Sequence, residues 1–117
     1  MFMTVQDVER ARKVFSEELY ASDGLRHYLE VVVPSRAQVN LEDSGLWSAS
    51  LPGVPLWAEA PTYEAVIEAM IGELREYATQ WREDLFEAPN HRENWGLVLL
   101  VEISNNQQLA EWLGCTL

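Results

Sequence analysis

A long amphipathic helix is the most constraining pattern in this sequence. Residues 63–87 place apolar side chains at i, i+3 and i+4 spacing, on one stripe of a helix: Tyr63, Ile67, Met70, Ile71, Leu74, Tyr77, Ala78, Trp81 and Leu85. Thr62 suits the position before the first turn, and Pro89 cannot continue the helix. A helix this long needs a broad apolar support, so we expect it to pack across a sheet.

The sequence before this helix has the period of β-strands. Residues 37–51 contain two runs of alternating apolar and polar side chains, separated by the turn-forming residues 43–45. This arrangement predicts a β-hairpin. Residues 54–60 alternate again, and Pro55 lacks an N–H donor, so we expect this third strand at an edge of the sheet.

The N-terminal region is predicted to be helical at its start. Residues 4–21 have helical spacing after the capping residue Thr4, and the Ser-Asp-Gly sequence of residues 22–24 is typical of a turn. Residues 25–33 have two interpretations. A short helix through Leu29 is one, and a strand at residues 31–33, which are three valines, is the other.

The C-terminal region is predicted to hold a strand and a short helix. Residues 97–103 are almost continuously apolar, which is typical of a buried strand. Ser104 or Asn105 can cap a last helix with Leu109, Trp112 and Leu113 as its apolar side, and Gly114 ends it.

These elements together predict an α+β fold with helices on one face of an antiparallel sheet. The expected parts are an N-terminal helix, a three-stranded sheet, one long amphipathic helix, a further buried strand and a short C-terminal helix. With 117 residues the chain fits a single domain. Residues 1–36 form its N-terminal helix and connecting segment, and residues 37–117 form the acidic part with the sheet and the long helix.

The charge of the chain is strongly negative and unevenly distributed. The net charge is −11; residues 1–40 contribute −1 (five cations, six acids) and residues 41–117 contribute −10 (three cations, thirteen acids). Such a field repels nucleic acid and anionic lipid and attracts basic partners, although it also serves solubility alone. The basic cluster Arg10, Arg12 and Lys13 is too small to predict tight DNA binding.

Several kinds of site are not expected. The single Cys115 allows no intrachain disulfide and no cysteine-based zinc site, and neither His27 nor His91 has a second ligand at metal-binding spacing. Glycine-rich phosphate-binding motifs are absent, so we expect no cofactor. We also find no signal peptide or apolar stretch of membrane-spanning length, so a cytoplasmic location is expected.

The long helix carries an acidic face that is not balanced by cations. Its only basic residues, Arg75 and Arg82, have no carboxylate three or four positions away, so the acids gain no ion pairs within the helix. The exposed acids are expected to be Glu64, Glu68, Glu73, Glu76, Glu83, Asp84 and Glu87. This face is either a solvated surface or a docking surface for a basic protein.

Two parts of the sequence resemble bacterial antitoxins. Residues 45–53 (GLWSASLPG) followed by residues 61–70 (PTYEAVIEAM) resemble the core of HicB-type antitoxins, in which a hairpin with a Pro-Gly turn leads to a Thr-capped helix. Residues 71–85, 88–98 (APNHRENWGLV) and 108–113 (QLAEWL) are similar to the C-terminal region of actinobacterial prevent-host-death (Phd/YefM-like) antitoxins, and residues 8–21 resemble their opening helix.

The resemblance implies toxin neutralisation by a paired or an orphan antitoxin. Many toxins of such pairs are small, basic RNases, which an acidic chain would mask. Residues 22–45 lack the Arg-Gly turn with which the Phd-type N-terminal domain contacts operator DNA, and this puts DNA binding in doubt. We therefore expect a non-enzymatic protein of a type II toxin–antitoxin system with a basic toxin as its partner.

The segment between the long helix and the apolar run is the most family-specific part of the chain. Asn90 and Asn94 suit a turn, and Trp95 can anchor the entry to the next element. The expected partner contacts are Glu64, Glu68, Glu76, Glu83, Asp84, Glu87, His91, Arg92, Glu93 and Trp112. A small enzyme using His91 with a carboxylate and a homo-oligomeric adaptor are the alternatives. Edge strands and the long helix favour a homodimer.

Overall fold

The computed structural model describes residue 6 and residues 21–114. The predicted N-terminal helix, the basic cluster and Cys115 lie outside these residues. The elements in chain order are α2 (Ala21–Val32), β1 (Gln38–Leu41), β2 (Trp47–Leu51), β3 (Leu56–Ala60), α3 (Tyr63–Gln80), a π-helical turn (Trp81–Leu85), a 3-10 turn (Arg92–Asn94), α4 (Trp95–Ile103) and α5 (Asn106–Gly114). The predicted α+β class is confirmed.

The sheet is antiparallel, and its strands lie in the order β1-β2-β3. Ala49 of β2 stands between Val39 of β1 and Ala58 of β3. Gly45 and Gly53 have φ angles of 89° and 86°, which favour glycine in the turns that join the strands. The hairpin and the edge position of β3 are thus as predicted, although β3 begins one residue after Pro55.

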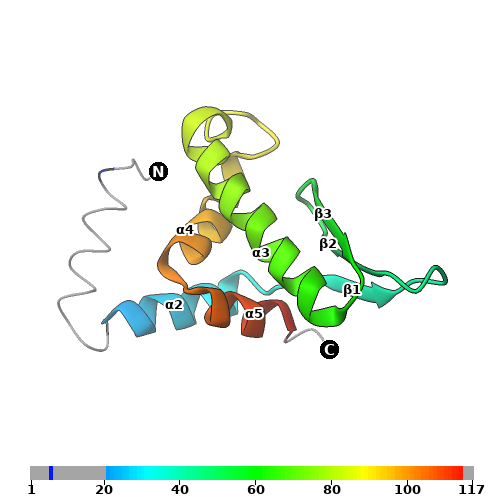
Figure 1. Cartoon of the computed structure of the whole chain (residues 1–117). Helices are drawn as coiled ribbons and strands as arrows, with labels where there is room; N and C mark the ends of the chain where they lie inside the picture. Colours follow the sequence, from blue (N-terminus) through cyan, green and yellow to red (C-terminus); the bar gives the residue numbers. More distant parts are fainter. Residues whose placement is uncertain (1–5, 7–20, 115–117) are drawn as a thin grey trace.

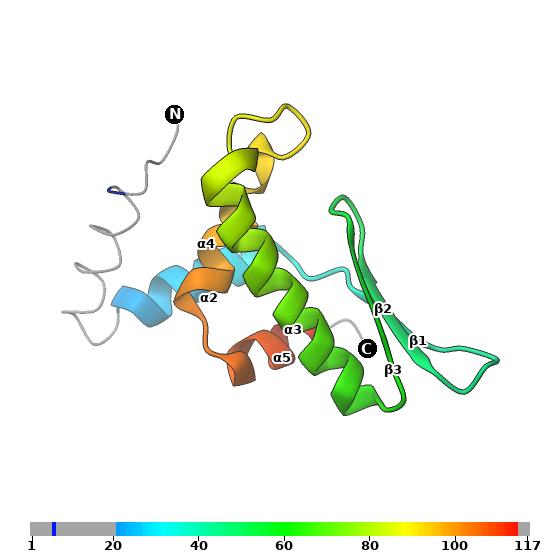
Figure 2. The ribbon, with the colours of Figure 1, turned by 45° about the horizontal axis from the view of Figure 1, so that its top comes forward.

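Helix α3 lies between the sheet and the other described helices (Figures 1 and 2). Its N-terminus is capped by Thr62, whose Oγ1 accepts a hydrogen bond of 3.1 Å from the Ala65 N–H. The predicted stripe is the buried side of the helix: Val66, Ile67, Met70, Ile71, Leu74, Tyr77 and Ala78. One side of this stripe packs on β2 and β3 and the other on α4 and α5.

The long helix changes geometry before it ends. Regular α-helix stops at Gln80, and the next turn, Trp81–Leu85, is π-helical. The Phe86 N–H donates to the Trp81 carbonyl, five residues back, at 2.9 Å. The predicted helix over residues 63–87 is therefore correct in place but shorter in its regular part.

The strand predicted over residues 97–103 is wrong, because this segment is helix α4. Residues 96–101 are all buried. Helix α4 packs against both α2 and α3 (Figure 1), so it is covered on several sides and shows no amphipathic period. A buried helix and a buried strand have the same apolar pattern, and here the pattern belongs to the helix.

The turn predicted at residues 22–24 and the strand predicted at residues 31–33 are also wrong. The backbone is helical from Ala21 to Val32, and the Val33 N–H still donates to the Leu29 carbonyl at 2.7 Å. Turn-forming residues cost little at a helix start, where the backbone N–H groups have no intrahelical acceptor. The alternative of a helix through Leu29 is correct and extends three residues further.

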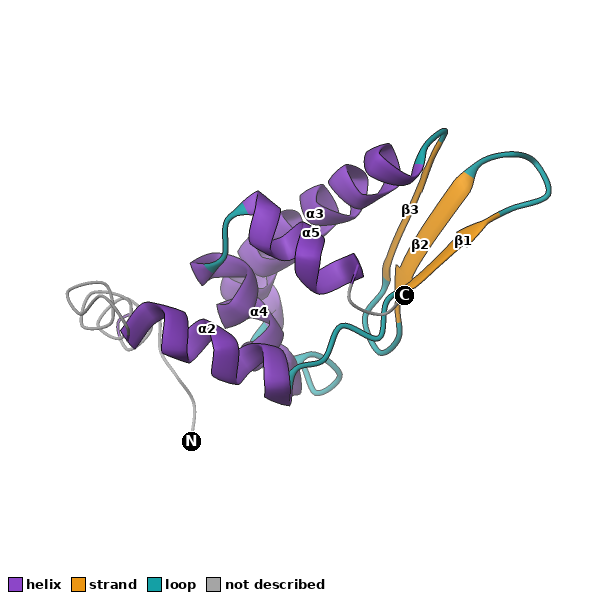
Figure 3. Cartoon of the chain, turned by 90° about the horizontal axis from the view of Figure 1, so that it is seen from below, coloured by secondary structure: helices purple, strands orange, loops and turns teal. Residues whose placement is uncertain are grey.

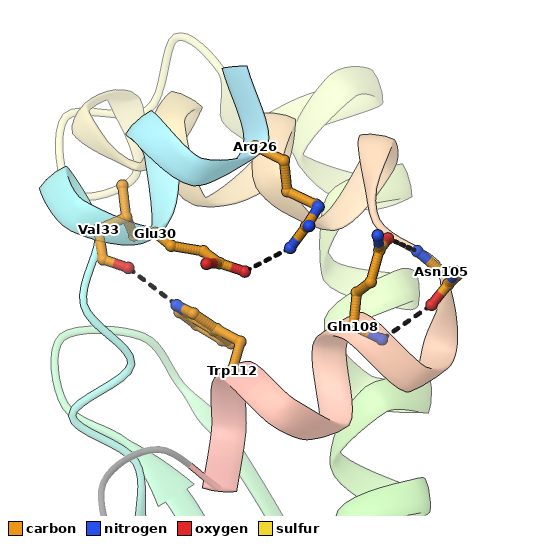
Figure 4. A network of polar contacts seen from close by, with 6 residues as sticks. All are labelled: Arg26, Glu30, Val33, Asn105, Gln108 and Trp112. Atoms are coloured by element: carbon orange, nitrogen blue, oxygen red, sulfur yellow. Dashed lines mark hydrogen bonds and ion pairs between the residues drawn. The ribbon is translucent and has the colours of Figure 1, made fainter. Parts of the chain in front are cut away.

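Helix α5 is fixed at both ends by side-chain hydrogen bonds (Figure 4). At its start Asn105 Oδ1 accepts from the Gln108 N–H and Gln108 Oε1 accepts from the Asn105 N–H, both at 2.8 Å. Near its end the Trp112 indole N–H donates to the Val33 carbonyl at 2.9 Å. Helix α5 is thereby joined to the end of α2. The helices lie together on one side of the molecule and the strands lie on the other (Figure 3).

Candidate functional site

The acidic side chains of the long helix reach solvent as predicted. Every carboxylate of α3, the π-helical turn and the residues just after it is exposed: Glu64, Glu68, Glu73, Glu76, Glu83, Asp84 and Glu87. They do not share one face, however. Glu64 and Glu68 lie on the side toward α5, whereas Glu73 and Glu76 lie on the side toward the β2–β3 turn and His91. The exposed acids therefore form two groups on different sides of α3, and the single acidic face expected from the sequence is not present.

The two arginines of the long helix are directed at the helices behind it. Arg75 donates to the Val101 carbonyl at 2.5 Å, to the Ser104 carbonyl at 2.9 Å and to Asn106 Oδ1 at 2.8 Å. Because the last carbonyls of a helix have no intrahelical donor, the Arg75 guanidinium serves as a cap for α4. Its positive charge is thus engaged at the α4–α5 connection.

Arg82 forms a bidentate pair with Glu102 of α4, at 2.7 Å from Nε and 2.6 Å from Nη2. Both side chains are largely buried, and the guanidinium also lies 5.8 Å from the centre of the Trp81 ring. This ion pair joins residues 20 positions apart, which the spacing within the helix could not predict. Together with Arg75, it leaves the exposed acids of α3 without neutralising cations from their own helix.

The loop containing His91 is held by hydrogen bonds to the end of the long helix. The Tyr77 hydroxyl lies 2.8 Å from His91 Nδ1 and accepts a hydrogen bond of 2.9 Å from the Asn94 amide. The Trp81 indole N–H donates to the His91 carbonyl at 2.7 Å. Burial raises the pKa of Tyr77, opposed by the Asn94 hydrogen bond. The His91 ring nitrogen that faces the fold therefore serves to hold the loop.

The remaining predicted contact residues fall into two groups. Arg92 and Glu93 are exposed, and an Arg92 Nη2 atom lies 3.5 Å from the Glu87 carbonyl. Trp112 is instead 5% exposed and its indole is bonded to Val33, so it supports the core and offers no surface. Trp95, predicted to anchor the entry to the next element, is 46% exposed, and the loop is instead bonded to the Trp81 indole.

A groove runs between α3 and α5 and was not predicted from the sequence. We call it the α3–α5 groove. It has a volume of about 660 Å³ and is lined by Tyr63, Glu64, Ile67, Glu68, Ile71, Gly72, Arg75, Asn106, Gln107 and Ala110. Arg75 and Asn106 join the two helices at one end. At the other end, Tyr63 lies close to Gly114. The two helices are therefore antiparallel along the groove.

A second hollow of about 500 Å³ lies on the other side of α3. Its lining includes Glu73, Glu76, Tyr77, Gln80 and His91, together with Pro55, Leu56 and Leu85. Within residues 21–114, His91 forms no hydrogen bond with a carboxylate. The predicted acid–base pair therefore has no geometric support there.

The described part of the chain contains no group of three or more His, Cys, Asp or Glu side chains placed to hold a metal ion. No helix within residues 21–114 is long and apolar enough to cross a membrane.

The fold of this chain is similar to that of an antitoxin. No protein-family model and no curated protein matches the sequence. A solved structure does match: the antitoxin part of a proposed toxin/antitoxin system from Syntrophomonas wolfei subsp. wolfei. The match has a TM-score of 0.66 and 22% sequence identity, and covers 78% of this chain and 67% of that one. The likeness establishes a shared fold.

Proposed function

We propose that this protein is an antitoxin that binds and neutralises a basic protein toxin through exposed carboxylates of α3. The observation that carries the proposal is the separation of charge on the long helix. Its carboxylates are exposed, whereas both of its arginines are engaged with α4 and the α4–α5 connection. A stability-driven surface would alternate the signs of its charges.

Two further observations support the proposal. The fold is similar to that of the antitoxin from Syntrophomonas wolfei. The net charge of −11 also favours rapid association with a cationic partner and opposes binding to nucleic acid. Since the sequence resembles antitoxins whose toxins are small, basic RNases, we propose an RNase as the partner. An acidic surface on such an enzyme would occupy the place of the RNA phosphates.

Expression beside the candidate partner tests this proposal. The basic protein encoded in the adjacent reading frame would be expressed alone and together with this chain. We expect growth arrest in the first case, recovery in the second, and a complex that persists through size-exclusion chromatography. Absence of a complex between the two purified proteins at micromolar concentration would overturn the proposal.

Substitution of His91 by Ala separates binding from catalysis. His91 holds its loop through Tyr77, so the variant should lose only part of its affinity for the partner, because an interface spreads its binding energy over several residues. A His91-dependent enzyme would instead lose its turnover entirely. The Tyr77→Phe variant is the matched control, since it removes the same hydrogen bond and leaves the imidazole in place.

A further inference from the structure

We propose that the α3–α5 groove receives a segment of the basic partner in which an apolar side chain is flanked by Lys or Arg. This inference rests on the proposed function and assigns it to one place on the molecule. The chemistry of the groove defines the occupant: its floor is apolar, and its outer rim is acidic.

The floor of the groove is apolar. Ile67, Ile71 and Ala110 lie along it, and its volume of about 660 Å³ falls within the range of small-ligand sites. The groove follows α5, whose nine residues correspond to roughly 13 Å of helix. This length matches two to three turns of a helix or a short extended peptide.

Gly72 gives the groove an open wall. A glycine in the middle of a helix costs roughly 1 kcal/mol relative to alanine, so such a position is either a tolerated accident or a point where another backbone comes close. Apart from its own helix, no part of residues 21–114 comes close, because a Cβ atom built at Gly72 meets none of their heavy atoms within 4 Å. The space beside Gly72 is therefore open to a second molecule.

The rim sets the charge of the occupant. Glu64 and Glu68 stand one helical turn apart at the groove, and neither forms an ion pair with a cation of residues 21–114. Arg75, at the far end, already donates to two carbonyls and one amide oxygen. The groove thus presents unbalanced negative charge beside an apolar floor, which complements an apolar residue between cations.

Blocking each wall tests the groove with matched controls. The variants Gly72→Trp on α3 and Gln107→Trp on α5 place a bulky side chain at the groove, and Ser44→Trp places the same side chain in the exposed β1–β2 turn. Affinity for the purified adjacent-frame basic protein would be measured by calorimetry, with the thermal unfolding midpoint of each variant as a folding check. We expect roughly tenfold or weaker binding for the two groove variants and unchanged binding for Ser44→Trp.

The double variant Glu64→Gln with Glu68→Gln tests the charge of the rim. Its affinity should fall at low salt and depend less on salt than that of the natural chain, whereas Glu59→Gln, on the outer face of β3, should change neither. If the natural chain binds and both groove variants bind equally well, the groove assignment fails while the proposed function stands. If the natural chain forms no complex, the proposed function fails and the groove assignment fails with it.

Discussion

Substitution of Arg75 by Met should destabilise the protein more than any other change of a single surface charge on α3. Arg75 supplies three hydrogen bonds, and two of its acceptors are carbonyls of the buried residues Val101 and Ser104. Leaving a buried acceptor without a donor costs about 1–3 kcal/mol, and loss of a cation at a helix C-terminus costs about 0.3–1 kcal/mol. For two carbonyls and one cation these terms add up to about 2–7 kcal/mol. Water can enter from the exposed Asn106 side and replace part of the lost bonding, so we expect the free energy of unfolding to fall by roughly 2–4 kcal/mol.

Urea unfolding followed by tryptophan fluorescence measures this loss, because Trp81 and Trp112 are both buried. The midpoint should fall without a change in the slope. Arg75→Lys keeps the charge but not the fork of donors, so it should recover only part of the stability. Arg92→Met, at an exposed loop position, should stay within about 0.5 kcal/mol of the natural chain. An Arg75→Met variant that unfolds at the natural midpoint would refute the assignment of Arg75 as the cap of α4.

Three further outcomes follow from the structure. Gly72→Ala should stabilise the chain by up to about 1 kcal/mol, since its Cβ meets nothing within 4 Å, and an equal or lower midpoint of unfolding would contradict this. The raised pKa of Tyr77 means that the folded state holds this proton more tightly than the unfolded state, so its contribution to stability is complete below pH about 10 and is lost above it. The decline in stability above pH 10 should be smaller in Tyr77→Phe, and a decline of the same size would sink the assignment. Multi-angle light scattering should give about twice the monomer mass of 13.4 kDa, because β1 and β3 leave edges in the described sheet and Leu41 of β1 is 60% exposed, and a monomer would exclude the predicted homodimer.

Elements with a distinctive period could be predicted from the sequence, and elements buried on several sides could not. The stripe of α3 and the alternation in residues 37–60 each match one geometry only, and both appear as expected. Residues 97–103 are apolar except for Glu102, because α2 and α3 cover them, and an apolar run of this length fits a buried strand as well as a buried helix.

Some features of the candidate site could be predicted from the helical period, and others depend on the packing of distant helices. The helical period predicts that Glu64 and Glu68 are exposed. The same period shows that Arg75 and Arg82 have no carboxylate within reach on their own helix. Their actual acceptors lie about 20 to 31 positions along the chain, so only the packing of α4 and α5 against α3 reveals them. The same packing creates the α3–α5 groove, which no pattern in the sequence indicated.

Carboxylate footprinting of the complex tests the central claim most directly. Exposed carboxylates would be coupled to an amine by a carbodiimide in the free chain and in its complex with the adjacent-frame basic protein, and the modified residues identified by mass spectrometry. We predict that Glu64 and Glu68 lose reactivity in the complex, while Asp43 in the β1–β2 turn and Glu59 on the outer face of β3 react as before. A complex in which Glu64 and Glu68 remain fully reactive would contradict a partner docked on the acidic surface at the α3–α5 groove.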